Sequence, residues 1–143
     1  MIREFNSLEE IENYYDQETN TYIFKENGEH INLVIFNFDL NLDANIEVYN
    51  INACDIHVRD INAWNIKANN IYANDINANH INAWNIDAGD INAWNINACD
   101  ISYWAVCFAY NSIKCKSITS KRENHKHFVL DGKLEVEENE KEN

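Results

Sequence analysis

The sequence predicts an all-β fold in which the chain winds into a β-solenoid, and a five-residue repeat carries this prediction. Ile occupies every fifth position from 46 to 101, and a small residue, usually Ala, stands two residues after each Ile except Ile101, where Tyr103 takes this place. Asp or Asn precedes each of these Ile residues except Ile81, which follows His80. A self-similar period of this regularity is the first signal to interpret in any sequence, because it defines the whole architecture.

A period of five matches neither an α-helix nor a plain strand, but it fits a short strand followed by a corner. Residues i and i+2 of a strand share one face, so each Ile and its Ala point inward together. Asn and Asp suit the corners because their side chains bond the nearby backbone. Four such sides close a quadrilateral coil, so we expect three to four stacked coils of about 20 residues at a spacing of about 4.8 Å. In these coils Ile71 lies in the core between Ile51 and Ile91.

A spacing of twenty would also align three sets of outward residues. They are Trp64, Trp84 and Trp104; Glu47, Lys67 and Asp87; and Asp60, His80 and Asp100. The tryptophan column either anchors a partner, as exposed aromatic residues often do, or shields a sheet face beneath a cap. The two charged columns are interpreted as ladders of compensating charge, because residues in one column of a flat face do not converge on a point. Trp94 falls outside the expected tryptophan column.

The unit Ile61-Asn62-Ala63-Trp64-Asn65 resembles the repeat of the pentapeptide-repeat proteins. The usual unit of that family, Ala-(Asp/Asn)-Leu-x-x, also places a small and a large inward residue two positions apart, although in the opposite order. The resemblance covers residues 46 to about 110 and implies a right-handed quadrilateral β-solenoid. The family includes acidic mimics of DNA that bind DNA gyrase. The amino-acid sequence of this repeat also resembles that of small phage and prophage proteins of Gram-positive bacteria.

The repeat and its flanks divide the chain into four expected segments. These are an N-terminal cap at 1–45, the solenoid at 46–110, a C-terminal cap with a hairpin at 111–136, and a disordered acidic tail at 137–143. In the first cap, Ser7-Leu8-Glu9-Glu10 predicts a capping box that opens a short helix. Asn27-Gly28 predicts a hairpin between strands at 21–24 and 31–36, and Asp131-Gly132 predicts a second hairpin.

The charge of the chain limits its partners. Twenty-four acidic and eleven basic residues give a formal net charge of −13. This acidity argues against direct binding to nucleic acid or anionic membranes, and it favours a basic protein partner. The four cysteines lack the paired spacing of a metal site, and no apolar run is long enough to span a membrane. We therefore expect no catalytic, cofactor or metal site and a cytoplasmic location, in the host cytoplasm if the protein is phage-encoded.

The expected function is that of a non-enzymatic interaction protein. An acidic solenoid of this kind would bind and inhibit a basic, nucleic-acid-handling enzyme, as a DNA mimic or a phage anti-defence protein of the anti-CRISPR type. The candidate contacts are the tryptophan column and four acids on different faces: Asp55, Asp75, Asp87 and Asp90. The alternative is a scaffolding protein that self-associates through its ends or its tryptophan face. Docking of the basic segment 114–127 onto the acidic cap of another copy would then give a homodimer.

Overall fold

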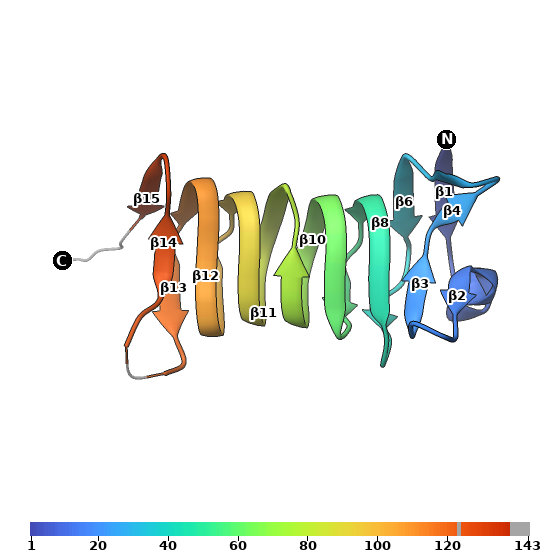
Figure 1. The fold of residues 1–143 in the computed structure, drawn as a ribbon, viewed down its shortest axis with the longest axis horizontal. Coiled ribbons are helices and arrows are strands. Elements are labelled where there is room, and N and C mark those ends of the chain that lie inside the picture. The colour runs from blue at the N-terminus through green and yellow to red at the C-terminus, as the bar shows by residue number, and fades with distance from the viewer. Residues whose placement is uncertain (123, 138–143) are drawn as a thin grey trace.

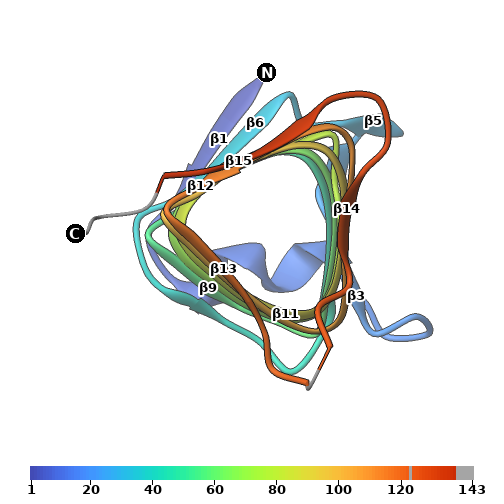
Figure 2. The ribbon, with the colours of Figure 1, turned by 90° about the vertical axis from the view of Figure 1, so that its left-hand side faces the viewer.

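The structure is a computed structural model that describes residues 1–122 and 124–137, and it confirms the β-solenoid (Figure 1). The chain is nearly all β and forms about six stacked turns. Seen end on, the turns superpose as a triangle, so the solenoid has three sides and not the four that were expected (Figure 2). Its right-handedness stays a prediction.

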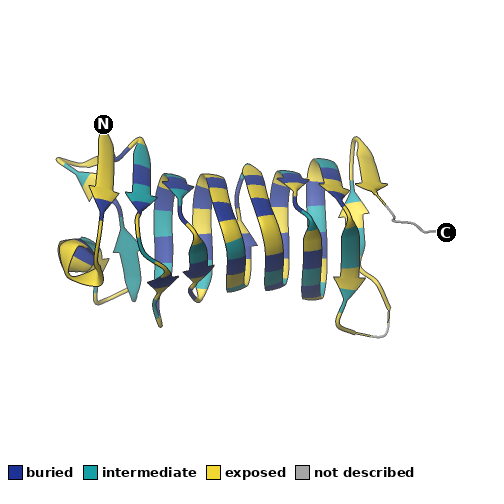
Figure 3. Cartoon of the chain, turned by 180° about the vertical axis from the view of Figure 1, so that it is seen from behind, coloured by how far each residue is buried: buried dark blue, intermediate teal, exposed yellow. Residues whose placement is uncertain are grey.

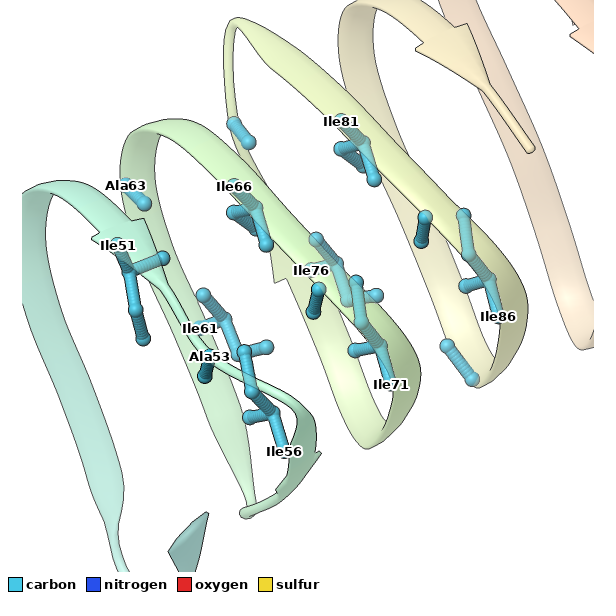
Figure 4. Close-up of a cluster of buried hydrophobic side chains, with 14 of the residues drawn as sticks. Ile51, Ala53, Ile56, Ile61, Ala63, Ile66, Ile71, Ile76, Ile81 and Ile86 are labelled. Carbon is cyan, nitrogen blue, oxygen red and sulfur yellow. The ribbon is translucent and has the colours of Figure 1, made fainter. Parts of the chain in front are cut away.

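Each coil of the regular repeat takes fifteen residues, and the expected period of twenty is wrong. Ile71 pairs with Ile56 in the preceding coil and with Ile86 in the next. The expected neighbours belong to other columns, because Ile51 pairs with Ile66 and Ile91 pairs with Ile76. Figure 4 shows the resulting rows of stacked Ile side chains. A five-residue repeat fixes the distance between corners but not the number of corners, so three-sided and four-sided coils satisfy it equally well.

The repeat itself forms five strands, all joined in parallel through the stacking of coils. They are β8 (Asn45–Asn52), β9 (Asp55–His57), β10 (Asp60–Asn77), β11 (His80–Asn97) and β12 (Asp100–Cys115). Every repeat Ile from Ile46 to Ile101 is at most 2 % exposed, and Ile51, Ile71 and Ile91 are buried as expected. Buried and exposed residues alternate along these strands (Figure 3), as the inward Ile and Ala positions require.

The solenoid starts before residue 46, because the expected N-terminal cap contributes a coil of its own. This coil consists of β3 (Thr21–Ile23), β6 (Leu33–Phe36) and β7 (Leu40–Asn41). Their side chains Tyr22, Val34 and Leu40 pair in parallel register with Ile46, Ile51 and Ile56 of the next coil. The spacing between sides is irregular here, which is why the five-residue pattern does not reveal the coil.

A short 3-10 helix, η1 (Leu8–Tyr14), covers the N-terminal end of the core. It lies across the triangle in Figure 2, and its Ile11 is fully buried. Beside it, β1 (Ile2–Phe5) pairs with β6 in parallel, and β2 (Tyr15–Asp16) pairs with β3 in antiparallel. The predicted capping box does not form, because the Ser7 side chain makes no capping bond and the Glu10 carboxylate accepts the backbone N–H of Asn6 at 2.6 Å instead of that of Ser7.

The predicted hairpin at Asn27-Gly28 is present but short. Both residues have positive φ, 55° and 81°, and they join β4 (Lys25–Glu26) to β5 (Glu29–His30). The longer flanking strands do not pair with each other, because β3 and β6 continue into different sides of the first coil.

The predicted C-terminal hairpin is wrong. The last strands are β13 (Ser117–Ser120), β14 (His127–Val129) and β15 (Lys133–Val136), and each pairs in parallel with β12. Asp131-Gly132 is therefore a corner of the last coil, where an added Cβ on Gly132 would overlap the Asn111 carbonyl oxygen. The backbone N–H of Glu137 still donates to the Cys115 carbonyl at 2.7 Å, and the rest of the expected tail, 138–143, lies outside the described residues.

The coil that β12 forms is wider than those before it. The register with β11 grows from fifteen residues to sixteen at Asp90 and Val106, and then to seventeen at Ile96 and Ile113. The first shift follows Tyr103, which takes an Ala position of the repeat and is fully buried. Its hydroxyl accepts the backbone N–H of Lys126 at 2.7 Å, so the buried polar atom is satisfied. The extra residues give the coil room for this larger side chain.

Candidate interaction face

We call a column the set of residues that occupy one position in successive coils. The expected column of Trp64, Trp84 and Trp104 does not exist. Twenty residues correspond to one coil plus one further side, so each of these tryptophans stands at a different corner. The Trp84 carbonyl accepts the backbone N–H of Cys99 at 2.9 Å, and Trp104 lies 5.8 Å from the Lys121 Nζ.

Trp94 is the residue that shares a corner with Trp64. The backbone N–H of Asn79 donates to the Trp64 carbonyl, and that of Trp94 donates to the Asn79 carbonyl, both at 2.9 Å. Tyr49 packs on Trp64 with ring centroids 5.4 Å apart, and Tyr110 stacks on Trp94 at 4.6 Å. These five residues form the aromatic column. Trp64 and Trp94 are 56 % and 51 % exposed, so the column lies on the surface.

A second column consists of carboxylates. Asp75 is in register with Asp90, and its backbone N–H donates to the Asp60 Oδ1 at 3.2 Å. Burial and the neighbouring carboxylates of Asp60 and Asp90 raise the pKa of Asp75. Among the described residues, no Lys, Arg or His forms an ion pair with this acidic column. The three acids therefore repel each other, and the cation beside them, Arg59, forms its ion pair with Asp43 while interacting with Asp60 only through its charge.

The four acids expected as contacts do not lie in one column. Asp75 and Asp90 belong to the acidic column, whereas Asp87 forms an ion pair with Lys121 at 2.7 Å and Asp55 accepts the Asn70 amide at 2.8 Å. Asp60 was missed as a contact because the period of twenty placed it with His80 and Asp100. A spacing of fifteen between Asp60, Asp75 and Asp90 is the signal that would have identified it.

The two expected charge ladders are also wrong. Lys67 pairs with Asn52 and Asn82, and not with the acids Glu47 and Asp87. His80 pairs with Asn65, and its Nδ1 lies 2.9 Å from the Asn95 amide nitrogen, so an amide ladder replaces the expected carboxylate contacts.

The acidic and aromatic columns border the same side of the triangle. We call this side the interaction face; it comprises 60–64, 75–79 and 90–94. Exposed Asn62, Asn77 and Asn92 lie between the two columns. Four residues separate the columns, which corresponds to about 13 Å along a strand. The face thus presents carboxylates at one edge, amides in the centre and indoles at the other edge.

The rest of the described structure shows no stronger candidate site. A shallow groove beside Gly89 is lined by Tyr72, Asp87, Trp104 and Lys121, but the ion pair and the indole contact of Lys121 occupy its charged groups. Burial raises the pKa of the Cys107 thiol to about 12, so it is not a nucleophile near neutral pH. Within the described ranges, no cluster of three or more His, Cys, Asp or Glu has the geometry to hold a metal ion. No helix in the described parts of the chain has the length and apolar character to cross a membrane.

Comparisons with protein-family models, with curated proteins and with solved structures each found no match. Membership of the pentapeptide-repeat family therefore stays a prediction that rests on the repeat itself.

Proposed function

We propose that this protein is a non-enzymatic interaction protein that binds and inhibits a basic, nucleic-acid-handling enzyme in the cytoplasm. The observation that supports the proposal is the acidic column. Asp60, Asp75 and Asp90 stack on successive coils and form no ion pair with a described residue, since the neighbouring Arg59 pairs with Asp43. A basic partner would relieve their mutual repulsion when it binds.

The spacing of the column suits a site that normally holds nucleic acid. Successive coils lie about 4.8 Å apart, so the carboxylates form a straight row at that interval. A strand of duplex DNA carries one phosphate charge per about 3.4 Å of helix axis, which is of the same order. Two of the three carboxylates are held in place, because Asp60 accepts the N–H of Asp75 and Asp90 accepts the N–H of Val106 at 3.1 Å. The net charge of −13 would steer the approach of a basic protein.

The test compares two variants of equal net charge. In the first, Asp60, Asp75 and Asp90 are changed to Asn. In the second, the exposed cap residues Glu4, Glu9 and Glu18 are changed to Gln. Proteins from the native host would be captured on each variant and on the parent protein, and then eluted with rising salt or with duplex DNA.

We expect the parent and the cap variant to retain a partner that duplex DNA displaces, and the column variant to lose it. Capture that survives neutralisation of the column, or that DNA cannot displace, would refute the proposal.

Self-association through the C-terminal end is a second candidate, favoured by the apolar residues of the last coil. Four apolar side chains of this coil are each at least 38 % exposed: Phe128, Leu130, Leu134 and Val136. The strands β14 and β15, which contain three of them, pair with β12 on one edge. Sedimentation equilibrium of the parent and of Phe128→Ser/Leu130→Ser decides this case. A monomeric parent protein at high concentration would exclude it.

A further inference from the structure

We propose that the interaction face docks an arginine-bearing segment of a protein partner, with a guanidinium group held between the indoles of Trp64 and Trp94. This inference rests on the proposed function, because it identifies the chemistry of the partner at the same face.

Asn79 interrupts a column that is otherwise aromatic. Tyr49 packs against Trp64 at a tilt of 42° and Tyr110 stacks on Trp94, and the coil of Asn79 lies on the other side of each indole. Two coil steps separate the indoles, about 9.6 Å. The Asn side chain is much shorter than an indole, so we infer that it forms the base of a notch between the outer parts of the two rings.

A flat cation is the group that this notch suits. Indole faces attract cations, and a guanidinium also stacks as a plane, which an ammonium group cannot do. The charge of the surroundings also favours a cation, because the chain is strongly acidic and the acidic column borders the same face. Nucleic acid bases could also stack on indoles, but their phosphates would be repelled by this field.

The acidic column supplies the second contact. It lies about 13 Å from the aromatic column, which is the span of four residues in an extended chain. An extended segment running along the coil direction would place one arginine in the notch and a second basic residue, four positions away, over Asp75. Asn62, Asn77 and Asn92 lie between these contacts and offer amides to the backbone of the segment.

The test uses fluorescently labelled peptides of about nine residues with two arginines four positions apart, and matched peptides with two lysines, measured by anisotropy. We expect the parent protein to bind the arginine peptide more tightly than the lysine peptide, because an ammonium group makes the cation–π contact without the planar stacking of a guanidinium. Trp64→Ala and Trp94→Ala should each remove this preference. Asn79→Trp should also remove it, because a third indole fills the notch while the fold is kept.

Two controls separate this inference from general acidity. Trp84→Ala removes an exposed indole from another corner and should leave the preference unchanged. The Asp60, Asp75 and Asp90 to Asn variant should weaken both peptides equally and keep their ratio. Circular dichroism and melting temperature verify that each variant folds.

Three outcomes would overturn the inference. Equal binding of both peptides with no effect of the Trp64, Trp94 and Asn79 variants would refute the notch, yet it would leave the acidic column and the proposed function intact. Binding of a single-stranded oligonucleotide that Trp64→Ala abolishes would assign the notch to bases instead. Failure of both peptides to bind, together with loss of DNA-displaceable capture from the host, would refute the proposed function as well.

Discussion

A disulfide between adjacent coils tests the fifteen-residue period directly. Asn77 and Asn92 are register partners on one side of the solenoid, and both are exposed. Neighbouring strands lie about 4.8 Å apart, within the Cα separation that a disulfide bridges. The double variant Asn77→Cys/Asn92→Cys, made after Cys54 and Cys99 are changed to Ser, should therefore form an intramolecular disulfide under mild oxidation.

The size of the effect follows from the coil. The new bond closes a loop of one coil, and a loop of about fifteen residues is expected to stabilise the folded state by about 3 kcal/mol at 25 °C. Urea unfolding with and without reductant measures this difference. Non-reducing electrophoresis and thiol titration establish that the bond has formed within one chain.

The matched control is Asn77→Cys/Asn97→Cys, a pair separated by the expected twenty residues. Asn97 pairs with Lys114 on a different side of the triangle, so this pair should not crosslink within the native chain. If the control pair crosslinks readily and the Asn77–Asn92 pair stays reduced, the three-sided register is wrong.

Further predictions concern the core, one corner and the last coil. Ile71→Asp buries an unpaired charge and should unfold the protein, whereas Tyr72→Asp at the adjacent outward position should leave the far-UV spectrum unchanged. Gly89→Ala places a Cβ 2.6 Å from the Asn74 carbonyl oxygen and should cost about 1–3 kcal/mol in urea unfolding. Burial and a neighbouring histidine lower the pKa of His127, so the unfolded chain binds the proton more readily. Stability should fall as pH drops below about 6.5, and His127→Gln should reduce this dependence.

The local structure of this protein is encoded in the sequence. Ile and Ala two residues apart specify which side chains point inward, and the Asp or Asn before each Ile specifies the corner. Both features are properties of five consecutive residues, so the strands, the buried face and the parallel solenoid could all be predicted. The first and last coils could not, because their sides are longer or irregular and do not keep the five-residue spacing.

The number of sides is decided by packing across the core. A side of five residues is about 16 Å long, so a square coil would enclose about 260 Å² and a triangular one about 110 Å². The square would have more than twice the area to fill with only one further Ile and Ala. The triangle is therefore better filled by these side chains, because voids in a core are destabilising. The volume that the side chains must fill depends on how the sides meet in three dimensions, and a linear repeat does not specify it.

The composition of the interaction face depends entirely on the number of sides in each coil. Trp64, Trp84 and Trp104 become neighbours only in a four-sided coil, whereas three sides bring Trp64 and Trp94 to one corner and Asp60, Asp75 and Asp90 to the next. The sequence alone determined which residues are inward and which are outward, since a strand alternates its faces by local geometry. Only the tertiary structure decided which outward residues meet, because contacts between coils depend on how many sides close each turn.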